Sequence, residues 1–189
     1  VREYMESAFG LGGFAKKGDW TITYSIFQMD LEDKLSAEQG GNTGDLTVTF
    51  TATGAEVLTK YRFSKTAKNS WEAIGGLRYT GKEYGAELEI NNVTVFDGSV
   101  DDNWLDLVVG ISNIYVISPT LLWTSQLDYG LGGSEGTIHF NTGVSKILNK
   151  SWMIRGAVDV KDIEYEEGNP VDSDWFYYKA TESTAGFSF

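Results

Sequence analysis

The chain has a single histidine, His139, and it is the first residue to consider for chemistry. An imidazole can act as a general base near neutral pH. A serine hydrolase, however, needs its nucleophile within hydrogen-bond reach of that base. Here the chain reads His139-Phe140-Asn141, and Ser145 lies six residues further on, about 20 Å along an extended strand. We therefore predict no catalytic residues, and expect His139 to be a hydrogen-bonded member of a polar interior.

Charged residues of both signs recur at alternate positions in segments that otherwise alternate between apolar and small residues. Alternate side chains of a strand point to the same face, so we assign this set to one inward face. Buried charges need partners, and the sequence therefore predicts a lumen packed with ion pairs. A narrow polar channel or ligand pocket running past Arg78 and Arg155 remains the alternative. The set is Glu56, Lys60, Arg62, Glu72, Arg78, Asp106, Asp128, His139, Arg155, Asp159, Lys161 and Glu182.

Acidic residues concentrate in three segments that are predicted to be outer loops, around 32–38, 97–102 and 162–174. Carboxylate oxygens are ligands for Ca²⁺ and Mg²⁺, which makes Asp101, Asp102, Glu166 and Glu167 weak candidates for a shared cation. No EF-hand spacing occurs, and the chain has no cysteine for a thiolate site. We predict no specific metal site and no cofactor.

Composition restricts the class of protein. The net charge is −12, which argues against nucleic acid as a partner. Glycine is frequent (22 residues) and proline rare (2), beside 6 Trp, 10 Tyr and 10 Phe, a balance that favours long antiparallel strands with tight turns. No apolar run reaches the ~18 residues of a membrane helix. Only alternate residues of a barrel strand face lipid, so this composition is compatible with a membrane β-barrel.

The segment Asp174–Phe189 shows the pattern most clearly. Its alternate residues are apolar toward Phe189 on one face and small or polar on the other, and aromatic residues stand at both ends. That spacing matches the ~25 Å apolar band of a tilted transmembrane strand. We therefore predict that it closes an outer-membrane barrel. The expected aromatic girdle comprises Trp20, Trp71, Trp123, Trp152, Phe187 and Phe189.

Eight segments have this alternation, and the connections between them are predicted to be short and long in turn. Short turns on one side, long loops on the other and an even strand number are typical of outer-membrane barrels. The predicted strands are Trp20–Leu31, Asp45–Ser64, Ser70–Ile90, Trp104–Ile117, Thr120–Leu131, Thr137–Ile147, Trp152–Tyr165 and Asp174–Phe189.

Residues 1–17 do not alternate. Tyr4, Ala8 and Leu11 are spaced for one side of a short helix, which the glycines at 10, 12 and 13 would end. We expect residues 1–17 to be a periplasmic lead-in, either a short helix or disordered, and residues 18–189 to form the barrel.

From about Trp71 onward the chain resembles a family of small Gram-negative outer-membrane proteins grouped with the eight-stranded OmpA-type barrels. The motifs are GGLRYTG (Gly75–Gly81), NWLDLVVGIS (Asn103–Ser112), LDYGLGGSEG (Leu127–Gly136), DIEYEEG (Asp162–Gly168) and the final GFSF. Ile111-Ser112 departs from the family, which usually has a basic residue there, and the first 70 residues match poorly. The resemblance implies the fold and the membrane, and it implies no reaction.

These observations predict an all-β protein: one eight-stranded, antiparallel, up-and-down transmembrane barrel in a bacterial outer membrane, whose leader is removed. Its expected role is structural or passive. Its expected partners are outer-membrane lipid, lipopolysaccharide and, through the C-terminal strand, the barrel-assembly machinery; we expect a monomer. Two alternatives remain, a narrow channel for small solutes and a soluble lipocalin-like binder. The lipocalin-like binder would bury Ile138, Phe140, Val158 and Val160 around a ligand.

Overall fold

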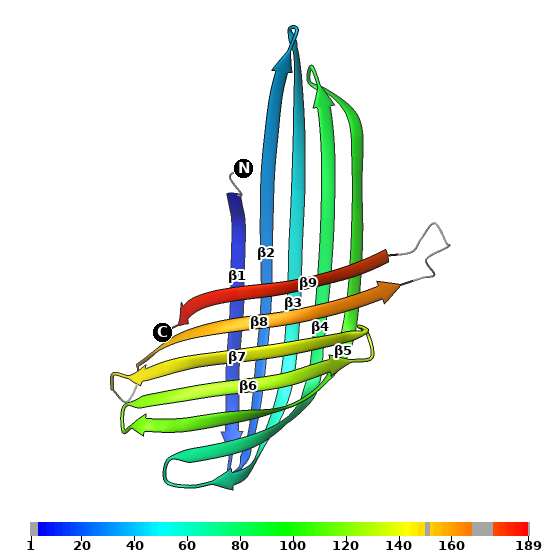
Figure 1. Ribbon diagram of the computed structural model, residues 1–189. Coiled ribbons are helices and arrows are strands. Elements are labelled where there is room, and N and C mark those ends of the chain that lie inside the picture. The colour runs from blue at the N-terminus through cyan, green and yellow to red at the C-terminus, as the bar shows by residue number, and fades with distance from the viewer. Residues whose placement is uncertain (1–3, 150–151, 168–175, 189) are drawn as a thin grey trace. The chain divides into compact units, whose positions relative to one another are not determined.

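The computed structural model describes residues 4–149, 152–167 and 176–188, and the elements in this part of the chain are β-strands. The described residues include no helix long and apolar enough to cross a membrane. The strands are β1 (Tyr4–Lys17), β2 (Trp20–Gln39), β3 (Asn42–Lys65), β4 (Asn69–Ile90), β5 (Val93–Ser118), β6 (Leu121–Leu131), β7 (Gly136–Ile147), β8 (Met153–Glu167) and β9 (Phe176–Ser188) (Figure 1).

The nine strands form one sheet in the order of the sequence. From β5 to β9 each strand pairs with the next in antiparallel register, with Leu127 opposite Ile111 on one side and Phe140 on the other. The predicted all-β, antiparallel, up-and-down architecture is therefore confirmed. The predicted number of strands was too low by one, and the sheet of the described residues is not closed into a barrel.

The additional strand is β1, in the segment expected to be a short helix or disordered. Its glycines do not end an element; they allow close contact with the neighbouring strand. A Cβ at Gly13 would lie 2.5 Å from the hydroxyl oxygen of Tyr24, so a larger residue would collide with that ring. Glycine at such a position marks close approach in a strand as well as the end of a helix, and the helical interpretation was wrong.

Two of the predicted long loops are also strand. β2 and β3 are joined at Gly40-Gly41, and β4 and β5 at Asn91-Asn92. All four of these turn residues have positive φ, which tight hairpin turns require and which glycine and asparagine tolerate best. The acidic residues around 32–38 and 97–102 consequently lie on strands β2 and β5. The predicted alternation of short and long connections does not hold at these two places.

The sheet divides into two compact units that share strands β1 to β5. Unit 1 comprises residues 1–13, 24–56 and 79–104, and unit 2 comprises 14–23, 57–78 and 105–189. This division cuts across the strands and not at residue 17, where the sequence had suggested a boundary. In unit 1, the rings of Phe50 and Tyr84 are tilted by 39° with centroids 4.9 Å apart. The ammonium of Lys82 lies 5.2 Å from the centroid of Phe50.

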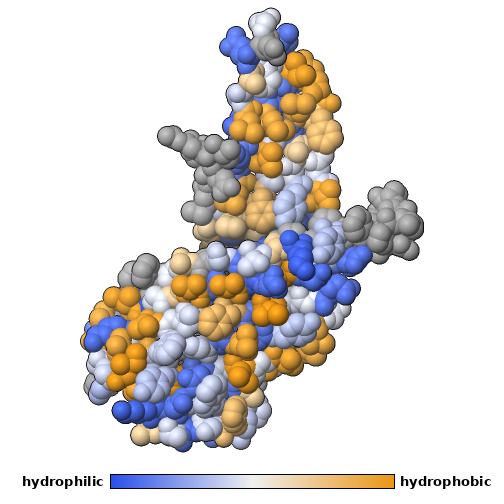
Figure 2. Space-filling view, viewed as in Figure 1, coloured by the Kyte–Doolittle hydropathy of each residue, from blue (hydrophilic) through white to orange (hydrophobic). Residues whose placement is uncertain are grey.

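Unit 2 has an apolar, exposed outer face and a buried inner face. On β5, Leu105, Leu107 and Val109 are about half exposed, whereas the intervening Asp106 and Val108 are fully buried. On the face of unit 2 that is turned to the viewer in Figure 2, apolar residues lie in several groups among polar ones. The same alternation continues on β6 and β7, so each strand contributes to both faces.

The inner face of unit 2 is concave. Lys60 on β3 donates a hydrogen bond of 2.6 Å to the side chain of Gln126 on β6. In a flat sheet these strands would lie about 14 Å apart, so the sheet must curve to bring the two side chains together. Leu58, Ile74 and Val108 form an aliphatic cluster on the same buried face.

Candidate functional site

The centre of the inner face is a row of four ionisable side chains from β4, β6, β7 and β8. Arg78 donates to Asp128 at 2.8 Å. Nδ1 of His139 lies 2.8 Å from Asp128, and Nε2 lies 2.6 Å from Asp159. An imidazolium satisfies both carboxylates, because it donates from each ring nitrogen. Nη2 of Arg78 also lies 3.2 Å from Nδ1 of His139, so the guanidinium contacts both members of the Asp128–His139 pair.

Local backbone contacts make room for this row. Gly110 on β5 is paired in register with Asp128. A Cβ at position 110 would stand 2.5 Å from the Cβ of Asp128, closer than two carbon atoms can approach. The absence of a side chain at Gly110 therefore lets Asp128 occupy the inner face between the strands that carry Arg78 and His139.

Further polar pairs flank the row on both sides. Arg155 donates to Asn141 at 2.6 Å, and Asn141 in turn donates to Asp159 at 3.0 Å. Toward β3, Arg62 lies between Asp19 (3.5 Å) and Glu72 (3.9 Å), and Ser112 donates to Glu72 at 3.3 Å.

Most of the residues predicted from the sequence for this face thus come together. Lys161 and Glu182 are opposite each other in the β8–β9 register, and both are half-buried. Glu56 is half-buried as well and belongs to unit 1. Gln126 and Asn141 were not among the predicted network residues, although both stand at inward positions and accept hydrogen bonds of 2.6 Å from Lys60 and Arg155. Their amides carry no charge, so the alternation of charged residues gives no signal for them.

Asp106 has a different role from the rest of the set. Its fully buried carboxylate accepts hydrogen bonds from the backbone N–H groups of Gly133 (3.2 Å) and Ser134 (2.8 Å) and from the hydroxyls of Ser134 (2.9 Å) and Thr137 (3.3 Å). It therefore fixes the β6–β7 turn against β5.

We expect Asp106→Asn to lower the free energy of unfolding by about 1.5–3 kcal/mol, because several donors then share one oxygen. Amide hydrogens of residues 132–137 should exchange faster, as measured by hydrogen exchange. Asp97→Asn changes an exposed carboxylate on the same strand and should alter stability by less than about 0.5 kcal/mol. Equal effects of the two substitutions would show that the turn does not depend on Asp106.

The four tryptophans of the predicted girdle lie close to the turns at one end of unit 2. Trp20 follows the β1–β2 turn, Trp71 the β3–β4 turn and Trp123 the β5–β6 turn, and Trp152 precedes β8. All four are exposed, and Trp20 packs on Tyr61 with ring centroids 4.7 Å apart. Phe187 belongs to β9, and nothing is described of its side chain; Phe189 lies outside the described residues.

The weak metal candidates do not form a site in the described part of the chain, where no group of three or more potential ligands gathers. Asp101 and Asp102 belong to unit 1 and Glu166 to unit 2, while the side chain of Glu167 is not described. Near the end of β8, Lys179 (3.1 Å) and Tyr177 (3.0 Å) donate hydrogen bonds to the carboxylate of Glu164. This exposed carboxylate is therefore engaged within the sheet.

Taken together, unit 2 has a hydrogen-bonded ionic interior, an apolar exterior and tryptophans near one set of turns. Such an arrangement stabilises the curvature of the sheet and separates the charged side chains of the inner face from the surroundings of the outer face. Comparison of the chain with models of known protein families gives no match, and comparison with the curated proteins gives none either.

Proposed function

We propose that this chain is an integral protein of a bacterial outer membrane, with unit 2 in the bilayer as part of a closed β-barrel and a structural or passive role. The observation that carries the proposal is the direction of the two faces. Leu107 on β5, Leu127 on β6 and Phe140 on β7 are exposed, whereas Arg78, Asp106 and Asp128 are buried. In water, the exposure of these apolar side chains and the burial of these charged ones would each cost free energy. In a bilayer the apolar face meets hydrocarbon.

Strand lengths support this placement. β6 and β7 have 11 and 12 residues, close to the ~9–11 that a tilted strand needs to cross a membrane. β3 and β5 are longer, at 24 and 26 residues. Their additional residues include those assigned to unit 1 and are not needed for the crossing.

The interior supports a passive role. The ion pairs of the inner face and the aliphatic cluster of Leu58, Ile74 and Val108 are buried side chains on the face that a closed barrel would turn inward, which supports a plugged interior. A lipid-exposed strand edge would leave backbone groups without partners. We therefore infer that the outer edges of β1 and β9 are covered in the membrane, and we retain β9 as the segment offered to the assembly machinery.

A soluble ligand-binding barrel is not favoured. It would require apolar side chains of β7 and β8 to be buried around a ligand. Ile138, Phe140 and Val158 are instead 50%, 43% and 46% exposed, and Val160 is half-buried. A ligand in the interior would instead contact the inner face, which carries the charged residues.

The protein is expected to require detergent or lipid for solubility and to insert into phospholipid vesicles. Because Trp20, Trp71, Trp123 and Trp152 lie near one set of turns, lipids brominated near the headgroup should quench tryptophan fluorescence more than lipids brominated near the chain end. Vesicles of the same lipid without bromine are the control. The proposal would be refuted if the protein were monodisperse in detergent-free buffer and brominated vesicles left its tryptophan fluorescence unchanged.

A further inference from the structure

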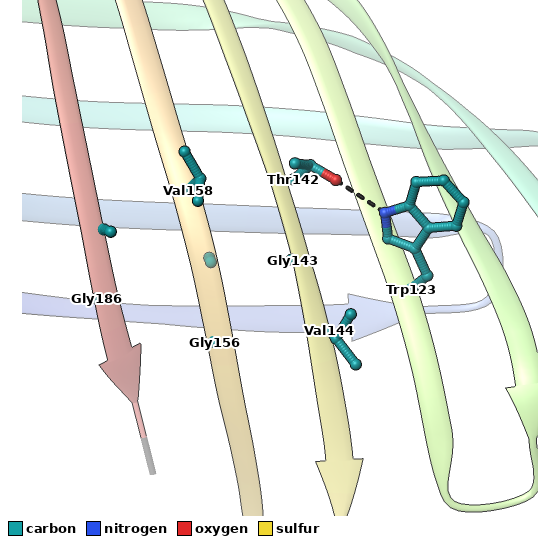
Figure 3. Close-up of a pocket in the computed structure, with 9 residues that line it drawn as sticks. Trp123, Thr142, Gly143, Val144, Gly156, Val158 and Gly186 are labelled. Atoms are coloured by element: carbon teal, nitrogen blue, oxygen red, sulfur yellow. Dashed lines mark hydrogen bonds between the residues drawn. The ribbon is translucent and has the colours of Figure 1, made fainter.

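The outer face of unit 2 is hollowed by a groove of about 500 Å³ across β6 to β9. Trp123, Val144 and Gly156 form one row across the strands, and Thr142, Val158 and Ala185 form the next. Gly156 has no side chain, so backbone forms part of the floor of the groove there. The residue opposite Gly156 on β9 is Phe187, of whose side chain nothing is described. Figure 3 shows Trp123 at one side of this floor and Val158 and Gly186 toward the other.

The lining of the groove suits hydrocarbon. The indole N–H of Trp123 would be its main polar demand, and this group donates to the hydroxyl of Thr142 at 2.8 Å (Figure 3). Trp123, Val144 and Val158 are each about half exposed, so their apolar surfaces are open to an occupant. A ligand without hydrogen-bonding groups can therefore fill the groove and leave no polar partner unsatisfied.

A positive charge stands at one end of the groove. Lys146 is two residues beyond Val144 on β7, on the same face and on the side of the turn that leads to β8. It is exposed, and its ammonium donates to the hydroxyl of Thr120 at 3.1 Å. That partner is neutral, and no carboxylate of the described residues pairs with this ammonium. Lysine at the end of an apolar membrane surface extends toward the phosphates of the headgroups.

We propose that the groove binds an acyl chain of an anionic phospholipid, with Lys146 beside the phosphate. The apolar lining contacts the acyl chain, and the ammonium of Lys146 favours a headgroup with a negative charge. This inference rests on the proposed function, because only a membrane-embedded unit 2 presents its outer face to lipid. The short turns of outer-membrane barrels face the periplasm, so the lipid belongs to the periplasmic leaflet.

The test is native mass spectrometry of the detergent-solubilised protein after mixing with phosphatidylglycerol. The unmodified protein should retain one lipid. Ala185→Phe fills the groove from an exposed position of β9 and should abolish retention. Ser183→Phe, a matched control, places the same ring on the same face two residues away and should leave retention unchanged. Circular dichroism verifies that both variants are folded.

The charge is tested separately. Lys146→Gln should reduce the preference for phosphatidylglycerol over phosphatidylcholine about fivefold, and Lys146→Arg should keep it. The groove would be refuted as the binding site if Ala185→Phe left lipid retention unchanged. If brominated vesicles still quenched the fluorescence of the same protein, the proposed function would stand. Absence of quenching would overturn both. Displacement of phosphatidylglycerol by lipopolysaccharide with the same dependence on Ala185 would overturn the choice of phospholipid.

Discussion

Leu127→Arg is expected to lower the stability of the membrane-inserted protein by about 2–4 kcal/mol, the cost of an arginine near the midplane on the lipid side of a barrel. Leu127 is 49% exposed and lies near the middle of β6, which runs from Leu121 to Leu131. Its neighbours in register are Ile111 on β5 and Phe140 on β7, both exposed on the same face. A guanidinium placed there has apolar neighbours on each side. Denaturant unfolding of the protein in vesicles, followed by tryptophan fluorescence, measures the change.

Val100→Arg provides the matched comparison. Val100 is 54% exposed and lies on β5, in the part of that strand that belongs to unit 1. If only unit 2 is embedded, this substitution should change stability by less than about 0.5 kcal/mol. A soluble protein would tolerate both arginines, because both side chains would extend into water. Similar small effects at the two positions would therefore contradict the membrane placement of unit 2.

The strands of unit 2 were predictable because their signal is local. Leu127 and Tyr129 alternate with Gln126 and Asp128 within one strand, and no distant residue is needed to recognise the period of two. The bounds of β6 to β9 agree with the prediction to within two residues at each end. The same alternation separated the apolar residues of each strand from the polar ones, and so assigned them to opposite faces of the sheet.

The long hairpins were missed because their strands carry charge on both faces. Asp97, Asp101 and Asp102 resemble a loop by composition, yet they stand on β5. The informative signal was the pair Asn91-Asn92, which accepts positive φ and so forms a tight turn. β1 was missed for the related reason that Gly13 suggested the end of a helix, whereas in the strand it lies beneath the ring of Tyr24.

The partners within the polar interior could not be predicted from the sequence. Parity places Lys60, Arg78 and Asp128 on one face, but it does not select the pairs. Lys60 meets Gln126 across three strand intervals only because the sheet curves. Likewise, Asp106 binds Ser134 because the β6–β7 turn folds back against β5. Both contacts depend on tertiary geometry and leave no periodic signal in the chain.

Arg78→Met is expected to lower the free energy of unfolding by about 3–5 kcal/mol, the cost of breaking a buried ion pair from one side. Arg78 and Asp128 are 4% and 2% exposed. Without the guanidinium, Asp128 keeps Gln126 (2.7 Å) and His139 (2.8 Å), but the row loses its permanently charged cation. Denaturant unfolding in detergent micelles, followed by circular dichroism, measures the loss.

Two further variants separate the ion pair from the loss of packing. Lys34→Met removes an arm of the exposed pair with Asp45, whose charged atoms are 3.7 Å apart, and should cost less than about 1 kcal/mol. Adding Asp128→Asn to Arg78→Met removes the uncompensated carboxylate, so the double variant should be more stable than Arg78→Met alone. If the added substitution instead lowers stability further, the destabilisation comes from lost volume in the interior, and the ionic row is not what holds the inner face of unit 2 together.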